Sequence, residues 1–156
     1  SDVIPLTLPL VMYIFSGSSL LSVLEMWLFI VIGGSFIFGF IGFNAAHHHP
    51  ETFHEGDAPR SKTVDWGIHQ LDAVCDRHEI TGNSFLVLTN FGDHALHHLF
   101  PTLDHNSLKN LYPVFKKTIK EFKVNLSMRS QAEMVVGQFQ QLTREIPNPV
   151  PPGSKN

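Results

Sequence analysis

The hydrophobic pattern divides the chain into two unlike parts. Residues 20–43 form an apolar run, LLSVLEMWLFIVIGGSFIFGFIGF, whose single charged residue is Glu25, near the start. A helix needs about 20 apolar residues to cross about 30 Å of hydrocarbon, so the run predicts a membrane span. Glu25 would still reach headgroup water there, and we interpret it as a boundary marker.

A shorter apolar run, residues 3–15, comes before this predicted span. We expect Pro5 and Pro9 to break or kink a helix there, and we interpret the run as the end of another span. Residues 16–19 (SGSS) are typical of a turn between two antiparallel spans. The sequence therefore predicts a transmembrane hairpin over residues 1–43.

Polar and apolar positions alternate in shorter blocks over residues 44–126, the predicted cytosolic region. We expect a short interfacial helix over 68–76, anchored at the headgroups by Trp66. The apolar run 85–91 is too short to span a membrane. Apolar residues recur at helical spacing over 108–122, which predicts an amphipathic helix interrupted at Pro113.

Residues 127–156 form the last predicted region. Ser130 and Glu133 have the spacing of a capping box and predict the start of a final helix. The tail from Pro147 is rich in proline, and we expect it to be disordered. The fold class predicted for the whole chain is all-α, with integral membrane helices and a cytosolic helical cap.

Charge and cysteine content exclude several classes of protein. All 11 Lys and Arg residues follow Asn44, which by the positive-inside rule places residues 44 onward in the cytosol and argues against a signal peptide. Acids in the same region nearly cancel them, so no basic face remains for nucleic acid. Cys75 is the single cysteine and is expected to be a buried, inert thiol.

The 10 histidines are the main candidates for chemistry. His94, His97 and His98 fall at i, i+3 and i+4, which places their rings on one face of a helix and favours a metal site over a polar surface. A second group, His47 and His48 followed by His49, lies where the predicted span meets the cytosol. Nitrogen ligation without clustered cysteines permits iron, zinc or copper, and this location suits a lipid substrate.

The segment HALHHLFP, starting at His94, resembles the third histidine box of membrane fatty acid desaturases. DHNSL from Asp104 and YPVFK from Tyr112 resemble the sequence after this box in desaturases fused to a cytochrome b5 domain. Asp65-Trp66 and Gln70-Leu71 are similar to the family's inter-box stretch. The third box is the most specific part of the match.

The resemblance implies a multi-pass enzyme of the endoplasmic reticulum membrane that takes part in lipid metabolism. Such an enzyme holds two iron ions with three histidine boxes, takes electrons from cytochrome b5 or its reductase, and uses dioxygen to remove hydrogens from a fatty acyl chain. Haem is implied only if a cytochrome b5 domain lies upstream. Because no first box precedes Asn44, the chain is expected to be a fragment.

The family's ligand roles carry over to five histidines: His94, His97 and His98 match the third box, and His47 and His48 match the second. Asn44 occupies the place of the second box's leading histidine.

Asn44, His49 and His54 are therefore possible ligands. Asp93 is expected to orient the imidazole of a ligand histidine without binding the metal itself. Two alternatives stay open. The protein could be a fatty acyl hydroxylase, or a catalytically incomplete membrane protein that binds metal or regulates.

Overall fold

The computed structural model describes residues 3–44, 46–63 and 65–154. The chain divides into two compact units, Ser1–Ile37 and Phe38–Asn156. The described residues are mainly helical, as predicted, with the addition of one short pair of strands in the second unit.

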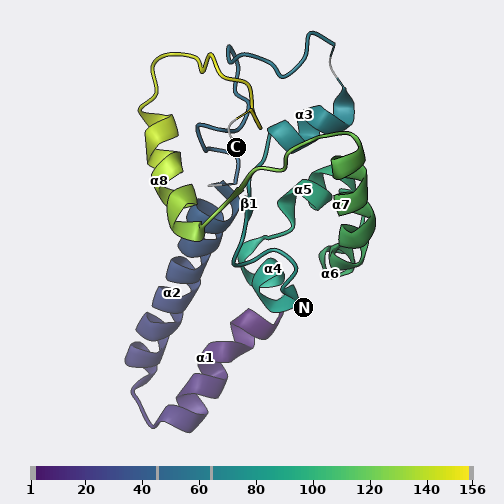
Figure 1. The fold of residues 1–156 in the computed structure, drawn as a ribbon. Coiled ribbons are helices and arrows are strands. Elements are labelled where there is room, and N and C mark those ends of the chain that lie inside the picture. Colours follow the sequence, from purple (N-terminus) through teal and green to yellow (C-terminus); the bar gives the residue numbers. More distant parts are fainter. Residues whose placement is uncertain (1–2, 45, 64, 155–156) are drawn as a thin grey trace. The chain divides into compact units, whose positions relative to one another are not determined.

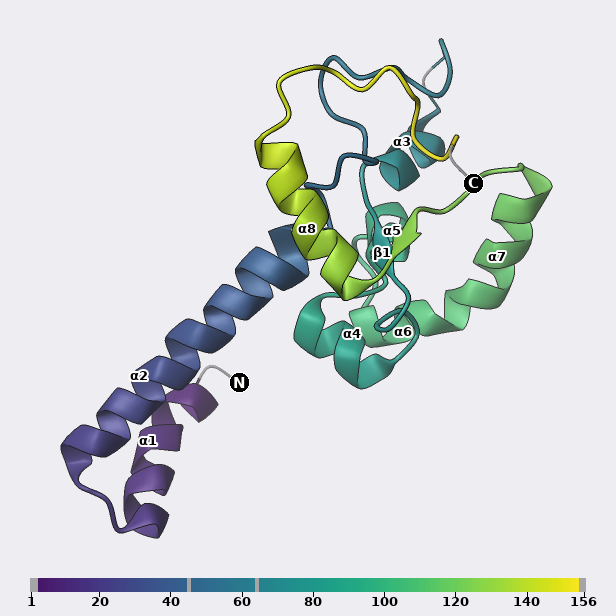
Figure 2. The ribbon, with the colours of Figure 1, turned by 60° about the vertical axis from the view of Figure 1, so that its left-hand side comes forward.

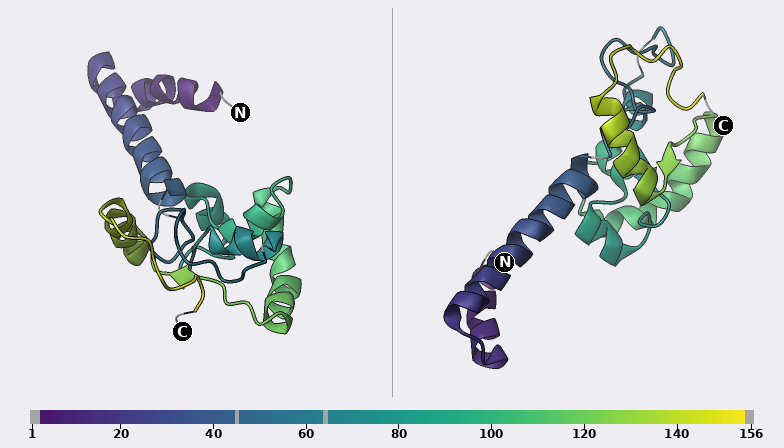
Figure 3. Two further views of the ribbon diagram at one scale, coloured as in Figure 1. Left: turned by 90° about the horizontal axis from the view of Figure 1, so that it is seen from above. Right: turned by 90° about the vertical axis from the view of Figure 1, so that its left-hand side faces the viewer.

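The first unit consists of helices α1 (Val3–Ser16) and α2 (Leu20–Phe36), which pack together and are joined by a short loop (Figure 3). Gly17 has a φ of 65°, a left-handed conformation that favours glycine. Ser19 caps α2 by accepting a hydrogen bond from the N–H of Ser22 at 3.2 Å. The helix Leu20–Gly42 is long and apolar enough to cross a membrane.

Helix α1 continues through both of its prolines. The prediction that Pro5 or Pro9 could break the helix is therefore wrong. Pro5 lies in the first turn, where a missing N–H costs little. Pro9 cannot donate to the carbonyl of Pro5, four residues earlier. The indole N–H of Trp27 donates to that carbonyl instead, at 2.9 Å. A partner from the neighbouring helix thus compensates for the bond that Pro9 removes.

The apolar helix ends in a π-helical segment, η1 (Ile37–Asn44). Within the second unit, its residue Gly42 packs closely against backbone: a Cβ there would lie 2.9 Å from the carbonyl oxygen of Asn90. The ring of Phe38 contacts that of Phe91 edge-on, with centroids 6.1 Å apart. The end of the predicted span is therefore built into the second unit.

The second unit consists of short helices joined by loops (Figure 1). They include one turn of 3₁₀-helix, η2, between α6 and α7. The elements that follow η1 in chain order are α3 (Trp66–Asp72), β1 (Asp76–Arg77), α4 (Ser84–Asn90), α5 (His94–Leu99), α6 (His105–Leu108), η2 (Lys109–Leu111), α7 (Tyr112–Glu121), β2 (Met128–Arg129) and α8 (Gln131–Leu142).

Several sequence predictions are confirmed here, with small shifts. Pro113 lies in the first turn of α7 and so marks its start rather than interrupting it. The capping box of α8 forms, since Ser130 and Glu133 exchange side-chain and backbone hydrogen bonds. The predicted helix over 68–76 is shifted at both ends. It starts earlier because Asp65 caps α3 at the N–H of Ile68, and it ends at Asp72, so the prediction is wrong for Asp76, which lies in β1.

The main hydrophobic core lies where α3 packs against α5 and α7 covers them. Leu71, Val74, Leu96, Leu108 and Phe115 are all buried in it. Cys75 is fully buried in a smaller cluster with Ala46 and Met134. Burial raises the pKa of the Cys75 thiol to about 12, so the predicted inert thiol is confirmed.

Strands β1 and β2 pair in parallel, Asp76 opposite Met128 and Arg77 opposite Arg129. The N–H of Asp76 donates to the Ser127 carbonyl at 2.9 Å, and that of His78 to the Arg129 carbonyl at 3.0 Å. This two-residue ladder joins segments that lie about fifty residues apart in the sequence.

The prediction of a disordered tail is wrong for the described residues up to 154. The tail runs back along the loop that carries residues 50–58 (Figure 2). Asn148 explains why: its N–H donates to Asp57 at 2.7 Å, its side chain donates to the Pro50 carbonyl at 3.1 Å, and its carbonyl accepts from Ala58 at 2.9 Å. Residues 155 and 156 lie outside the described residues.

Candidate metal centre

Helix α5, which carries three of the five predicted ligands, is fixed at its N-terminus by a buried carboxylate. Asp76 is 1% exposed, and its side chain accepts from the backbone N–H of His94 at 2.7 Å and of Ala95 at 3.3 Å. These two N–H groups belong to the first turn of α5, where no carbonyl of the helix can accept them. Asp76 therefore determines where the three histidines of α5 begin.

A tight turn over residues 91–93 connects α4 to α5. Phe91 and Asp93 have φ values of 54° and 51°, which are uncommon for residues other than glycine. Between them, a Cβ on Gly92 would lie 2.5 Å from Ile80 and 3.0 Å from Val87, so only glycine fits.

Arg77, the neighbour of Asp76 in β1, fixes the start of this turn. Its guanidinium donates to the carbonyls of Asn90 and Phe91 at 2.5 and 2.8 Å. The two residues of β1 therefore hold the two ends of the turn, one at the end of α4 and one at the start of α5.

Three of the predicted ligands come together. The ring of His47 lies 4.6 Å from that of His94 and 5.0 Å from that of His98, and the last two rings are 5.2 Å apart, centroid to centroid. One ring nitrogen from each forms a set whose members all lie within 4.8 Å of one another. We call these residues the three-histidine group. Its members come from stretches almost fifty residues apart in the sequence.

The geometry fits a metal after a small contraction. An imidazole nitrogen binds a first-row metal at about 2.0–2.1 Å, so two nitrogens on one ion are at most about 4.2 Å apart. The three-histidine group needs to close by roughly 0.6 Å to meet this limit, which a rotation of the rings can supply.

Hydrogen bonds at the far nitrogens favour metal binding by His47 and His98. His47 Nδ1 lies 3.2 Å from the carbonyl oxygen of Ala73, and His98 Nδ1 lies 3.1 Å from Oε1 of Gln70. Both partners are acceptors, so in each ring the proton is on Nδ1 and the lone pair is on Nε2. This arrangement, in which an acceptor outside the metal's own contacts fixes the tautomer, is usual for metal-binding histidines.

Burial keeps these rings neutral, which metal binding requires. It lowers the pKa of His94 to about 2, helped by the neighbouring rings of His47 and His98. It also lowers the pKa of His98 to about 4 and shifts that of His47 in the same direction. Near neutral pH the three rings therefore carry no charge and do not repel a cation.

His97 lies beside the three-histidine group but on its edge. Its ring centroid is 6.1 Å from that of His94 and 6.2 Å from that of His98. A different histidine is closer, since the ring of His105 lies 4.7 Å away. Phe91 covers this side, with its ring 4.8 Å from His94 and 5.3 Å from His97.

The remaining histidines of the second group separate into different roles. The ring of His48 faces that of His54 at 6.4 Å. His54 donates from Nδ1 to the Thr52 carbonyl at 2.9 Å, which leaves a lone pair on a buried Nε2 that has no hydrogen-bond partner among the described residues. His54 is thus prepared to bind a metal.

His49 is not prepared in this way. Its Nδ1 accepts the N–H of Glu51 at 3.2 Å, so the neutral ring carries its proton on Nε2. The ring packs against Gly137 of α8, where a Cβ would overlap it. A structural role in seating α8 accounts for both contacts.

Asn44 and Asp93 hold the backbone in this structure. The carbonyl of Asn44 accepts the N–H groups of His47 and His48, each at 3.1 Å. The carboxylate of Asp93 accepts from Gly82 N–H at 2.8 Å and from the Tyr112 hydroxyl at 3.0 Å. The ligand role of the Asn44 amide and the orienting role of Asp93 therefore stay predictions.

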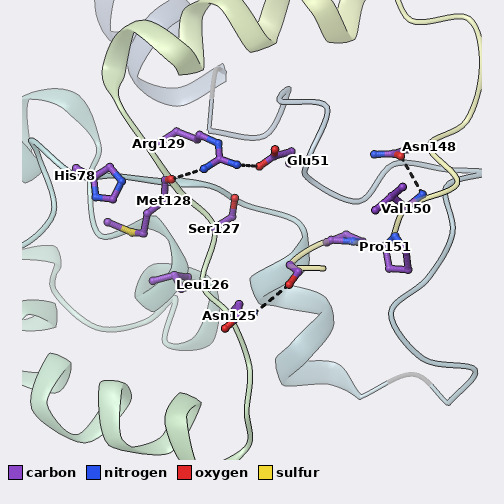
Figure 4. Close-up of a pocket in the computed structure, with 12 residues that line it drawn as sticks. Glu51, His78, Asn125, Leu126, Ser127, Met128, Arg129, Asn148, Val150 and Pro151 are labelled. Atoms are coloured by element: carbon purple, nitrogen blue, oxygen red, sulfur yellow. Dashed lines mark hydrogen bonds and ion pairs between the residues drawn. The ribbon is translucent and has the colours of Figure 1, made fainter. Parts of the chain in front are cut away.

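A separate pocket of about 290 Å³ opens between β2 and the C-terminal tail (Figure 4). None of the five predicted ligands lines it. The Arg129 guanidinium crosses its wall to pair with the Glu51 carboxylate, and the tail closes the other side where Asn125 donates to the Gly153 carbonyl at 3.2 Å. Because Glu51 N–H also bonds His49, this wall and the second histidine group share one loop.

Sequence reasoning missed four residues that shape the centre: Asp76, Gln70, Phe91 and His105. Asp76 and Gln70 contact groups that lie 18 and 28 positions away in the sequence. Phe91 and His105 lie outside the helix that carries the rings they contact. Gln70 and His105 entered the sequence analysis only as parts of segments that resemble the family. A polar residue inside an otherwise apolar stretch, as Asp76 is beside Val74 and Cys75, was the one signal available.

Comparison of the sequence with known families assigns the chain to a class of protein. A sequence model described as "Fatty acid desaturase" matches residues 2–130, which is most of the chain. The chain therefore belongs to the fatty acid desaturase family, and the resemblance drawn from HALHHLFP is confirmed. No solved structure gives a significant match.

Two curated relatives narrow the comparison. The chain is 49% identical, over 98% of its length, to a protein from Drosophila melanogaster named cytochrome b5-related protein, of which it covers 35%. It is 31% identical, over 48% of its length, to a probable Delta(5) fatty acid desaturase C from Dictyostelium discoideum, of which it covers 16%. The chain thus spans about a third of the first relative and less of the second.

Proposed function

We propose that this chain supplies the second and third histidine groups of a desaturase-like oxidoreductase acting on fatty acyl chains. The enzyme would use two iron ions and dioxygen, would take electrons from cytochrome b5, and would lie in the endoplasmic reticulum membrane with its histidines facing the cytosol. Family membership supports the reaction class, and the names of the two relatives support the acyl substrate and the link to cytochrome b5.

One observation carries the proposal: His47 meets His94 and His98 from a distant stretch of chain, with Nε2 left unprotonated in His47 and His98. A polar surface that happens to be rich in histidine would not need fixed tautomers or rings kept neutral by burial. Both features are what a metal centre needs before the metal arrives.

The donor set divides in a way that suits two ions. The three-histidine group would hold one. His48 and His97 are the remaining family ligands on this chain, and His54 is proposed as an additional donor because its Nε2 faces no other partner among the described residues. His49 is left out because its proton is on the nitrogen that would have to bind.

Bound iron would supply the oxidising power, by activating dioxygen to take hydrogen from an unactivated methylene. The protein's own contribution is to hold the ions and to shield the reacting carbon from water. No side chain acts as a nucleophile in this proposal. The apolar helix Leu20–Gly42 is long enough to cross a membrane and would hold the enzyme in the bilayer, where acyl chains are found.

The test is iron content and product in the protein at its natural length. We expect purified protein to contain iron, and His94→Ala to lose most of it while His69→Ala, an exposed histidine outside the centre, retains it. Mass spectrometry of acyl chains from cells that express the wild type should show a product two hydrogens lighter. Iron-free wild-type protein would refute the proposal.

A fatty acyl hydroxylase is the nearest alternative, because the same ligands serve both reactions up to the removal of hydrogen. Its product would be heavier by one oxygen, and the same mass spectra separate the two. A catalytically incomplete metal-binding protein is favoured by one observation, the amide at Asn44 where the second box has a leading histidine. It predicts bound metal without any acyl product.

A further inference from the structure

Two of the five predicted ligands have a ring nitrogen that is bonded to an acceptor, and His97 does not. In His47 and His98, Nδ1 is bonded to an acceptor, the Ala73 carbonyl and the Gln70 side chain. In His97, Nδ1 is buried and has no hydrogen-bond partner among the described residues. A buried polar nitrogen without a partner is unfavourable, and a nearby acceptor would remove that cost.

His105 is that group. It lies in the first turn of α6, and its ring centroid is 4.7 Å from that of His97, with 36° between the planes. Phe91 contacts both rings, at 5.3 Å from His97 and 4.8 Å from His105. The two histidines lie eight positions apart with the end of a helix between them, so no local spacing connects them.

The protonation of His105 can be read from its own hydrogen bond. Its Nε2 lies 3.1 Å from the carbonyl oxygen of Gly92, which can only accept. The proton of the neutral ring is therefore on Nε2, and Nδ1 carries the lone pair. If His97 binds metal through Nε2, its Nδ1 must carry a proton that needs an acceptor. The His105 ring is the neighbour that can supply one, since the two centroids are 4.7 Å apart and a rotation of the rings would bring its lone pair to that proton.

We propose that His105 is a positioning residue of the metal centre, whose Nδ1 accepts the Nδ1–H of His97 while its Nε2–H remains bonded to the Gly92 carbonyl. The benefit of this arrangement to a metal rests on the proposed function, whereas the contacts among His97, His105 and Gly92 do not depend on it. The chain of bonds from His97 through His105 to Gly92 would fix the His97 ring to the turn that starts α5. His97 then has a tautomer set by an acceptor, as His47 and His98 do.

A simpler role for His105 is packing, in which its ring fills space against Phe91 and His97. Three substitutions separate the two roles. His105→Asn places an amide oxygen near the position of Nδ1 and keeps the acceptor, but loses most of the ring. His105→Gln places an amide near Nε2 and keeps the bond to Gly92. His105→Phe keeps a ring and loses both polar atoms.

The first experiment reads the tautomers without metal. The protein at its natural length, labelled with 15N at histidine and reconstituted in lipid, is studied by solid-state NMR, and the His97 and His105 signals are assigned from the variants that lack them. We expect the proton on Nδ1 in His97 and on Nε2 in His105. We expect His105→Phe to give a mixture of tautomers at His97. A wild-type His97 protonated on Nε2, or a tautomer unchanged in His105→Phe, overturns the proposal.

The second experiment measures affinity for Co²⁺ alone, by its visible absorption, in metal-free protein. We expect His105→Asn, and the control His69→Asn, to bind within about threefold of wild type. His105→Gln and His105→Phe should weaken at least one binding phase by about 10–100-fold. If His105→Phe kept the affinity and His105→Asn lost it, the role would be packing and the proposal would be overturned. Equal binding or equal loss in all three variants would overturn it as well.

The two experiments keep this inference apart from the proposed function. If wild-type protein bound neither Co²⁺ nor iron, the proposed function would fail, and the NMR result would still decide whether His105 holds His97. If metal binds and the His97 tautomer does not depend on His105, the inference fails and the proposed function stands.

Discussion

Asp76 is the residue on which the position of α5 depends most directly, and its removal gives a quantitative prediction. Asp76→Ala would leave the buried N–H groups of His94 and Ala95 without an acceptor. Each unsatisfied buried donor costs about 1–3 kcal/mol. Loss of the buried charge, whose pKa is raised to about 6 by burial, offsets part of this. We expect a net loss of about 2–4 kcal/mol, and about half of that for Asp76→Asn, whose amide oxygen still accepts one N–H.

The loss can be measured through Cys75, the single cysteine of the chain, which is fully buried in the same unit. A thiol-reactive fluorescent dye in detergent reports the temperature at which Cys75 becomes accessible. For a unit of this size, 1 kcal/mol corresponds to about 3–5 °C in Tm, so we expect Asp76→Ala to lower Tm by about 10 °C.

Asp65 offers a matched control, because it also caps a helix, by accepting from Ile68 N–H at 2.9 Å, but is exposed. Asp65→Ala should cost about 0.5–1 kcal/mol and less than about 5 °C. If Asp76→Ala lowered Tm no more than Asp65→Ala does, the reasoning that a buried carboxylate anchors α5 would be refuted.

Three further predictions test other parts of the second unit. Gly137→Ala should lower Tm by several degrees, because its Cβ would overlap the ring of His49, whereas Gly34→Ala, with open space around it, should not. Burial lowers the pKa of His94 to about 2 in the folded state, and lowers those of His47 and His98 in the same direction, so the unfolded chain binds more protons at these rings as the pH falls below 6.5. Circular dichroism melts should therefore show a lower Tm at pH 5.5 than at pH 7.5, and equal midpoints would contradict this. Asn148→Ala removes the side-chain bonds to the Pro50 carbonyl and from the Val150 N–H, so it should loosen the tail and speed its proteolysis, measured against wild type by mass spectrometry; an unchanged cleavage rate would count against a role for this side chain.

Local sequence signals predicted most of the helices, because their causes are also local. The capping box of α8 needs only Ser130 and Glu133, four residues of chain, and the length of the run from Leu20 is enough to indicate a long apolar helix. The spacing of His94 and His98 likewise places their rings on one face of α5. In each case the structure-forming contacts lie within one or two helical turns.

The failures came from partners distant in the sequence. Pro9 breaks an isolated helix, but the indole of Trp27 replaces the lost bond from the next helix. The tail looks disordered by composition, yet Asn148 finds acceptors and a donor in a loop about ninety residues earlier. No pattern within either segment contains that information.

The candidate site shows the same division. The sequence was enough to predict the histidines as ligands. Which nitrogen of each ring carries the proton depends on an acceptor or donor that tertiary folding supplies. His49 and His54 look equivalent as neighbours of the second group. The N–H of Glu51 occupies the lone pair of His49 Nδ1, so His49 is not free to bind metal through it. The carbonyl of Thr52 accepts the Nδ1 proton of His54, which leaves the lone pair of its Nε2 for a metal.

The pairing of β1 with β2 has a consequence for synthesis on the ribosome. Asp76 N–H and His78 N–H have their acceptors at Ser127 and Arg129, which emerge about fifty residues later. At translation rates of about 5–20 residues per second, this segment waits several seconds for its partner. A nonsense mutation between His98 and Ser127 would therefore leave a truncated product that has all five predicted ligand histidines but lacks the strand that pairs with β1.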